Sequence, residues 1–181
     1  MTPMTLDAST ARLTLSTGVE GKASRLGHDL VLVLEDWSAA AELDGQTPTA
    51  ATLTARVASL RVESGTGGAK PLSDKDRQTI RENALEALKA DVHPNVTFTS
   101  NEITQVAGGF ALAGTLSIAG TSRPVVVDLR VAPEGASVTM AARVPVVQTE
   151  YGVKPYSAML GALRLRDEVE VGLAGTVALP A

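Results

Sequence analysis

The sequence predicts an all-β domain of short antiparallel strands that carries one helix. Residues 109–131 alternate apolar and polar side chains on both sides of a turn, as the two strands of a hairpin do. Further alternating runs follow each other along the chain, and one stretch has apolar residues at helical spacing. A length of 181 residues suits one domain with a single core, so we expect one domain over residues 1–181.

Strands are expected wherever apolar residues alternate with polar ones or run without interruption. Residues 30–34 are apolar throughout, which predicts a strand whose two faces are both covered. Residues 1–9 show no sustained pattern and are expected to form a loose lead-in. The strands, eight or nine in number, are predicted at residues 11–16, 30–34, 37–43, 52–63, 95–100, 110–118, 125–131, 138–147 and 168–178.

The predicted strand 52–63 changes phase halfway. Leu53 and Ala55 fall on one parity, whereas Leu60 and Val62 fall on the other. A slip of one residue indicates a β-bulge near residues 58–59. The alternative is a twisted strand that turns one polar residue inward.

A helix is predicted to begin at Ser73 and to end before Pro94. Ser73 can cap the first turn together with Asp76 as an acidic capping box. His93 precedes a proline, which disfavours helical backbone at that residue. The apolar stripe of this helix is expected to pack on the outer face of strand 30–34, and it consists of Ile80, Ala84, Leu85, Leu88 and Val92.

The hairpin has one apolar wall and connects its strands through residues 119–124, which are typical of a turn. Pro145 lies inside the later run 138–147. Because proline cannot donate a ladder hydrogen bond, we expect it at an edge, at a bulge or at a strand end.

The composition excludes several classes of function. The net charge is −4, and no cluster of Lys and Arg alternates with aromatic residues, so nucleic-acid binding is not expected. The chain has no cysteine and therefore no disulfide or thiol chemistry. No segment reaches the roughly 20 apolar residues of an integral membrane span. The N-terminal residues lack a secretory-signal pattern, which favours the cytoplasm.

Three stretches resemble conserved patterns of the YceI-like family, which comprises lipocalin-like proteins associated with polyisoprenoids. Asp76, Arg77, His93 and Arg123 lie in or beside these stretches. The stretches are GHDLVLVLEDWSA, SDKDRQTIRENALEALKADVHPNVTFTS and GTLSIAGTSRPVVVDLRV.

Periodicity alone leaves a sandwich and a barrel open, and the resemblance implies the barrel. We therefore expect an antiparallel eight-stranded lipocalin-like barrel with one amphipathic helix packed on the outside. Aromatic residues make up only 3% of the chain, so the lumen of such a barrel would be underfilled and could hold a slender ligand. The alternative is an interior filled by small aliphatic side chains.

The resemblance implies a non-catalytic protein that binds a long-chain isoprenoid or quinone-like lipid in the lumen and uses no cofactor. Residues predicted to bind this lipid lie on the apolar parity of the strands or near the barrel mouth. They are His28, Leu30, Leu32, Phe98, Phe110, Leu112, Leu116, Val127, Leu129, Met140, Tyr151 and Tyr156.

Two of these assignments have alternatives. His28 is a candidate contact for the lipid head group; it could instead fix a loop, together with Asp29, through hydrogen bonds to the backbone. Tyr151, Lys154 and Tyr156 could form a lid over the opening, or could pack as a surface loop against the barrel end.

Other functions remain open. His28 could serve as the general base of an enzyme that acts on the lipid. A barrel with a filled lumen could serve as a stress-related interaction protein, and the sequence also allows a homodimer. A metal site is not predicted, because neither His28 with Asp29 nor Asp91 with His93 has a recognised ligand spacing.

Overall fold

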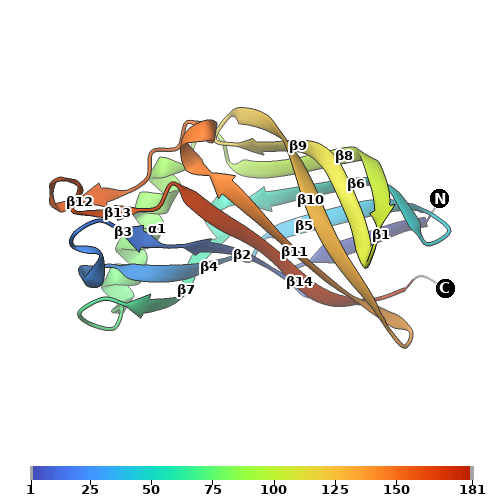
Figure 1. Ribbon diagram of the computed structural model, residues 1–181, viewed down its shortest axis with the longest axis horizontal. Helices are drawn as coiled ribbons and strands as arrows, with labels where there is room; N and C mark the ends of the chain where they lie inside the picture. The colour runs from blue at the N-terminus through green and yellow to red at the C-terminus, as the bar shows by residue number, and fades with distance from the viewer. Residues whose placement is uncertain (1, 180–181) are drawn as a thin grey trace.

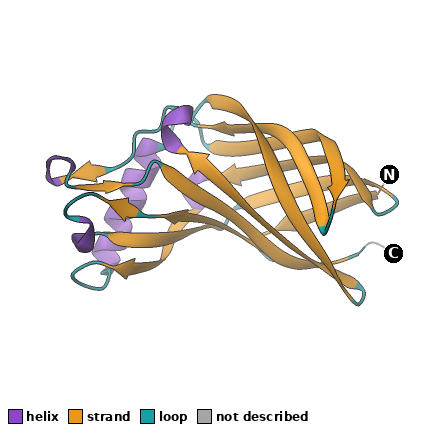
Figure 2. Ribbon diagram, viewed as in Figure 1, coloured by secondary structure: helices purple, strands orange, loops and turns teal. Residues whose placement is uncertain are grey.

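The computed structural model describes residues 2–179 and has an all-β fold with one α-helix. Antiparallel strands form one large curled sheet, and a smaller sheet and the helix lie together at one end of it (Figure 1). We call this the helical end. Figure 2 shows that loops and short helices gather there, whereas the other end consists almost entirely of strands and their turns.

The large sheet has eleven strands, not the eight of the expected barrel, and it has two more than the nine strand ranges predicted from the sequence. In spatial order they are β1 (Thr2–Asp7), β5 (Trp37–Asp44), β6 (Thr47–Arg56), β8 (Asn95–Val106), β9 (Gly109–Ile118), β10 (Thr121–Glu134), β11 (Ser137–Val147), β14 (Glu168–Ala178), β2 (Ala11–Thr17), β4 (His28–Leu34) and β7 (Leu60–Gly67). The small sheet contains β12 (Ser157–Ala158), β13 (Leu163–Leu165) and β3 (Val19–Glu20). The helices are α1 (Asp74–Ala87) and the short 3-10 helices η1 (Ser24–Leu26), η2 (Val57–Ser59), η3 (Gln148–Tyr151) and η4 (Met159–Gly161).

One additional strand is the N-terminal segment, which was predicted to be a loose lead-in. β1 pairs with β5 along its whole length, so that Thr5 lies opposite Ala40. Its Leu6 is buried in the apolar cluster at this end of the sheet. The segment is too short and too interrupted by Pro3 for its own pattern to reveal a strand, and the pairing with β5 stabilises it.

The other additional strand arises because residues 52–63 do not form one strand. The 3-10 helix η2 separates β6 from β7, and the buried Val57 anchors this corner. β6 pairs with β5 and β8, whereas β7 pairs with β4 at the far edge of the sheet. The phase change therefore marks a crossing between two parts of the sheet, and both the bulge and the twisted strand were wrong.

The curled sheet has two edges, β1 and β7, and it also opens along part of its length. β10 and β11 pair only where Leu129–Glu134 lies beside Ser137–Ala142. Beyond these residues the two strands separate and are not paired with each other. Pro124 and Pro145 lie in these separated parts, one on each side. The expectation that Pro145 lies at an edge is confirmed, because a proline there removes no hydrogen bond between the strands.

The helix begins as predicted, and a complete capping box fixes its first turn. The Ser73 side chain accepts a hydrogen bond from the Asp76 backbone N–H at 3.1 Å, and Asp76 Oδ2 accepts one from the Ser73 N–H at 2.9 Å. The last helical residue is Ala87, several residues before the proline at which the helix was expected to end.

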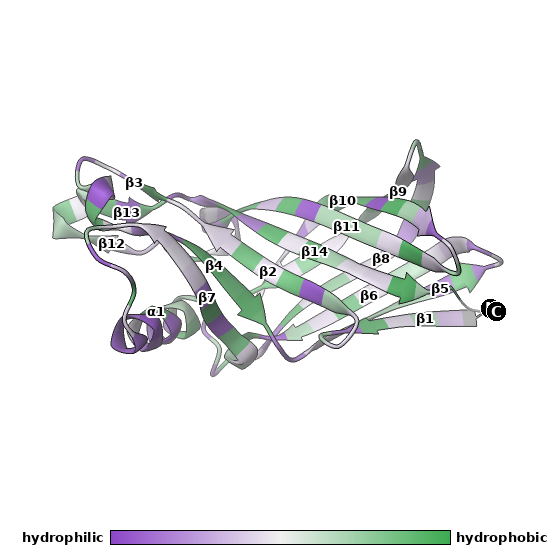
Figure 3. Cartoon of the chain, turned by 90° about the horizontal axis from the view of Figure 1, so that it is seen from below, coloured by the Kyte–Doolittle hydropathy of each residue, from purple (hydrophilic) through white to green (hydrophobic). Residues whose placement is uncertain are grey.

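The helix packs on the interior side of the sheet, and the expected position on the outer face of β4 was wrong. Ile80 and Ala84 contact the cluster of Leu30, Leu32, Leu60 and Val62, and these residues line the same cavity. Leu30 and Leu32 are the inward-facing parity of β4. Figure 3 shows the hydrophilic residues of α1 on its outer side, with apolar segments of β4 beside it. The helix therefore forms part of the cavity wall.

The capping box makes the helical end sensitive to acid. The Asp76 carboxylate forms hydrogen bonds with the backbone and the side chain of Ser73, and these hold the pKa of Asp76 below the ordinary value of 3.8. A carboxylate with a lowered folded-state pKa stabilises the fold above its unfolded pKa, and this contribution is lost as the pH falls through the folded pKa. We expect Asp76→Ala to lower the melting temperature at neutral pH, and this difference from the wild type should vanish in strong acid.

Thermal melts followed by circular dichroism across this pH range would test the expectation. Asp74→Ala is the matched control, because Asp74 carries the same charge in the same helical turn but takes no part in the capping box. An equal, pH-independent effect of both substitutions would contradict the prediction.

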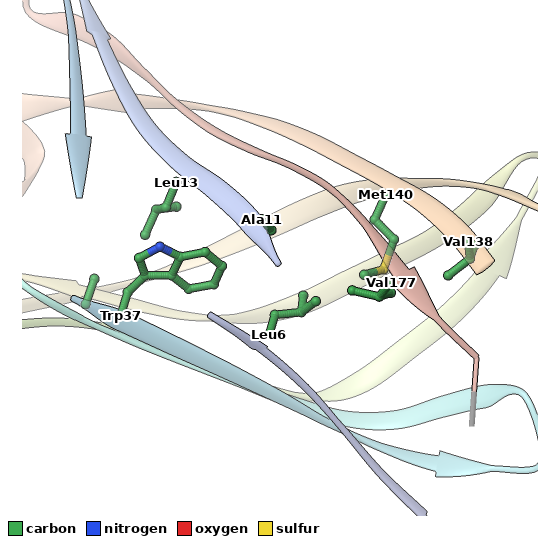
Figure 4. Packing of buried hydrophobic residues seen from close by; sticks show 8 residues of the cluster. Leu6, Ala11, Leu13, Trp37, Val138, Met140 and Val177 are labelled. Atoms are coloured by element: carbon green, nitrogen blue, oxygen red, sulfur yellow. The ribbon is translucent and has the colours of Figure 1, made fainter. Parts of the chain in front are cut away.

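The core at the end of the sheet opposite α1 is an apolar cluster around the single tryptophan. The Trp37 ring lies next to Leu13 and Leu6, and Met140 and Val177 face them from β11 and β14 (Figure 4). Trp37 Nε1 is buried without a hydrogen-bond partner among the described residues. The cluster joins the two halves of the curled sheet, because its members come from β1, β2, β5, β6, β11 and β14.

Candidate functional site

The curled sheet and α1 enclose a cavity of about 1310 Å³. Pockets for small ligands typically measure about 300–1,000 Å³, so this cavity exceeds the usual size. Its lining extends from the helical end to the β5–β6 and β8–β9 turns near the opposite end, with Pro48 and Gly108 among its residues there. The interior is therefore hollow along most of the sheet, and the expectation of a roomy lumen agrees with the structure.

Strand alternation explains why the walls are apolar. Successive side chains of β9 and β10 point to opposite faces, so Leu112, Leu116, Val127 and Leu129 face inward. Across the same sheet, Met140 on β11 faces inward too, and it is 5% exposed. The apolar parity that the sequence predicted for the hairpin is the cavity wall.

The connection of the hairpin is shorter than predicted. Only Ala119 and Gly120 join the strands, with φ angles of 49° and 83°, and Thr121 already pairs with Ile118. Positive φ at both central residues gives a turn whose twist matches that of the strands. A Cβ on Gly120 would lie 2.6 Å from His93 Nε2, so the glycine also makes room for this ring.

All twelve residues predicted to bind the ligand line this one cavity. The structure brings together residues from β4, β8, β9, β10 and β11 with the segment after β11. Their role in binding stays a prediction.

His28 lies at the helical end of the cavity and is tied to the chain. Its Nε2 donates a hydrogen bond of 2.6 Å to the carbonyl oxygen of Lys70. Asp29 Oδ1 accepts a hydrogen bond from the Val19 N–H at 3.0 Å. Both residues therefore fix loops through the backbone, which was the alternative to a head-group contact. The imidazole keeps its Nδ1 edge for further interactions.

The two tyrosines occupy different environments. Tyr151 is 3% exposed and packs in an apolar cluster with Ile118, Val146 and Val169. Burial raises the pKa of its hydroxyl above 10.0. It is a fixed part of the wall, as expected for a ring packed against the barrel end. Tyr156 is 49% exposed and lies at the mouth.

Lysine side chains line the helical end of the cavity, and of these the sequence had singled out only Lys154, as part of a possible lid. Lys70 and Lys75 line the cavity here together with Lys154, and within residues 2–179 none of the three side-chain ammonium groups forms a hydrogen bond or an ion pair. Thr17 Oγ1 also lines this region and is buried without a partner there. The mouth therefore carries more positive than negative side chains, and its ammonium groups and the Thr17 hydroxyl are available for hydrogen bonds with a ligand. Strand periodicity could not reveal it, because these residues come from loops and a helix.

The helix supplies a further part of the wall that was not predicted. Thr79 and Asn83 line the cavity beside Ile80 and Ala84. The helical spacing of the apolar residues had identified Ile80 and Ala84 as one side of the helix. It did not indicate that this side faces the cavity.

Across residues 2–179 no three His, Asp or Glu side chains lie close enough together to hold a metal ion. No helix in this part of the chain has the length and hydrophobicity needed to cross a bilayer.

Comparison with known proteins places the fold in a family. The YceI-like domain matches residues 5–177. BcnA of Burkholderia cenocepacia is 19% identical with a TM-score of 0.71, and the similarity covers 96% of this chain and 99% of BcnA. The YceI protein of Campylobacter jejuni is 16% identical with a TM-score of 0.63, over 83% of this chain and 85% of that protein. No curated protein gave a significant match.

Proposed function

Because the chain belongs to the YceI-like family, we propose that it carries one long apolar amphiphile in the cavity without altering it chemically. Lipid binding is known at the level of this family. The proposal extends it to this chain and to a polyisoprenoid or quinone-like lipid, with the apolar chain along the sheet and the head group at the helical end.

The observation that carries the proposal is the size and chemistry of the cavity. Its volume of about 1310 Å³ is bounded mainly by aliphatic side chains, and such a space favours a hydrocarbon chain over water. Burial of each methylene group contributes about 0.8 kcal/mol. A ligand with several isoprene units therefore gains enough free energy to offset its lost freedom, even without a specific polar contact.

The polar groups at the helical end give the ligand an orientation. The ammonium groups of Lys70, Lys75 and Lys154 lack partners in the described chain, and the Thr17 hydroxyl has none either. A buried hydroxyl without a partner costs free energy that a ligand oxygen would recover. The lining at the opposite end offers only uncharged polar side chains, such as Gln46, Thr47 and Gln105, so an anionic head group would find cationic partners only at the helical end.

The hydrogen bond of His28 supports carriage over catalysis. Its Nε2 is held by the Lys70 carbonyl oxygen, and no Ser, Thr or Tyr hydroxyl bonds to the imidazole among the described residues. The free Nδ1 therefore has no bonded side-chain hydroxyl in the described chain that it could activate as a nucleophile. His28 is better placed to shape the mouth.

Ligand length is expected to control affinity. In a series of prenyl alcohols, each added isoprene unit should tighten binding by a constant factor until the chain fills the cavity, after which affinity should level off. Displacement of a fluorescent fatty acid such as cis-parinaric acid measures this series.

Organic extraction of protein purified from its native host, followed by mass spectrometry, should yield a stoichiometric lipid. An extract without lipid, combined with an affinity that does not depend on chain length, would reject the proposal. The variant His28→Ala should still take up the ligand.

A further inference from the structure

The helical end projects an apolar tip, residues 156–161, into solvent. Leu160 is 109% exposed and Met159 is 56% exposed. Both have positive φ angles of 56° and 54°, and Gly161 follows at 87°. Residues other than glycine seldom adopt this left-handed conformation. Its occurrence at two successive apolar residues holds the Leu160 side chain outward.

Hydrogen bonds fix the base of the tip. The Ala23 N–H donates to the Ala162 carbonyl oxygen at 2.8 Å, and the Leu165 N–H donates to that of Tyr156 at 2.9 Å. Arg164 Nη1 donates to the Gly161 carbonyl oxygen at 3.0 Å. The small sheet β12–β13–β3 joins these segments. The exposure of Leu160 is therefore built into a fixed turn.

The tip and the neighbouring helix η1 form one larger apolar surface. Leu26 in η1 is 50% exposed and Tyr156 is 49% exposed, and both η1 and η4 contact β13. Single exposed apolar residues are ordinary on protein surfaces, but a group of large ones at one end of a molecule indicates an interaction site. Figure 3 shows that β12, β13 and β3 project beyond α1 at this end.

Basic side chains are frequent in the two segments that carry this apolar surface. Residues 18–27 and 152–166 contain five basic residues and one acidic residue, whereas the whole chain has a net charge of −4. The acidic residue, Glu20, is paired with Arg164 at 3.0 Å. The others, Lys22, Arg25, Lys154 and Arg166, are exposed. The local charge is therefore opposite to that of the protein as a whole.

We propose that residues 156–161, with Leu26 and the basic residues of these two segments, dock on an anionic lipid bilayer. Apolar side chains that enter the interface and cations that meet anionic head groups are the two components of peripheral membrane binding. The docking goes beyond ligand carriage and does not depend on what the cavity holds.

The docking surface adjoins the mouth of the cavity. Leu26, Tyr156 and Leu163 belong to the docking surface or its base, and all three also line the cavity. A docked molecule would therefore place the mouth against the lipid surface. An apolar chain could then pass between bilayer and cavity without crossing water.

Flotation with vesicles tests the proposal. The wild-type protein should float with vesicles of phosphatidylcholine and phosphatidylglycerol in equal parts, and added salt should weaken this binding. Leu160→Asn should reduce it roughly tenfold, because it removes one inserted apolar side chain. Asparagine adopts the left-handed conformation readily, so the fold of the turn should persist.

Charge reversal tests the basic residues. Lys22→Glu with Arg25→Glu, at two exposed residues that do not line the cavity, should reduce binding roughly 25-fold or more, since each basic residue near an anionic membrane contributes about a fivefold effect. Two matched controls should bind as the wild type does: Val126→Asn, which removes a 60% exposed apolar residue of β10, and Arg143→Glu, whose side chain is 83% exposed on β11.

Failure of the wild-type protein to float would overturn the proposal, as would equal binding by Leu160→Asn or an equal loss with Val126→Asn. Uptake of cis-parinaric acid from solution, measured on the same variants, reports on the cavity. Retained uptake without flotation rejects the docking alone, and absent uptake with normal flotation rejects only the carriage.

Discussion

Two tryptophans placed on the inner face of the hairpin are expected to weaken the binding of long-chain ligands strongly. Leu116 and Val127 face the cavity from the neighbouring strands β9 and β10. Indole rings at both positions would block the slender space between the hairpin and the opposite strands. Excluding about four methylene groups of a ligand removes about 3 kcal/mol, which is roughly a hundredfold in affinity.

The displacement of cis-parinaric acid by long and short prenyl alcohols measures this effect. Short alcohols, which need less of the cavity, should lose far less affinity than long ones. Thr115→Trp with Val126→Trp is the matched control, because these residues lie one position away on the same strands and are exposed on the outer face. If the inner and outer pairs behaved alike, the ligand would not occupy the cavity.

Removal of two arginines of α1 is expected to release the helix from the sheet. Arg77 Nη1 donates to the carbonyl oxygens of Val62 and Glu63 at 3.0 and 2.9 Å, and Arg81 Nε donates to that of Leu60 at 2.9 Å. These carbonyls belong to β7, an edge strand with no neighbour on that side. The two guanidinium groups thus satisfy backbone groups that would otherwise lack protein partners.

The double variant Arg77→Met with Arg81→Met should lose about 2 kcal/mol of unfolding free energy, since partly buried hydrogen bonds from charged groups contribute about 1.5–3 kcal/mol each and are only partly additive. Because α1 forms one wall of the cavity, ligand release should also accelerate. Urea denaturation measures the first effect and stopped-flow release of cis-parinaric acid measures the second.

The control for this variant is Arg61→Met. Arg61 pairs with Glu35 at 2.7 Å on the surface of the same region, and both side chains are more than half exposed. Such a pair contributes at most about 1 kcal/mol. A double variant as stable as this control would show that packing alone holds the helix.

Much of the fold follows from short-range pattern. Alternation predicted both strands of the hairpin 109–131 and the parity that faces inward, and Ser73 with Asp76 predicted the start of the helix correctly. Each of these features is decided within a few residues, because side-chain direction and capping depend on sequence neighbours. The apolar parity also identified the nine strand candidates, and these line one cavity together with His28, Tyr151 and Tyr156.

The wrong predictions concern features that depend on which distant segments lie side by side. β1 is a strand because β5 offers it a partner, and residues 52–63 divide at Val57 because their halves pair at different places in the sheet. The stripe of α1 was assigned to the outer face of β4, since its periodicity reveals an apolar side and not the surface that this side meets. The choice among distant partners depends on total buried area and on edges that need covering.

The sequence by itself determined an all-β chain with one capped helix, inward-facing aliphatic residues and few aromatic rings to fill the interior. Only the tertiary structure decided that eleven strands form the curled sheet, that α1 forms part of the cavity wall, and that Lys70, Lys75 and Lys154 line its helical end. Secondary structure and side-chain parity are properties of neighbours along the chain. Cavities and clusters of charge arise where segments distant in sequence come together, and no local pattern encodes those meetings.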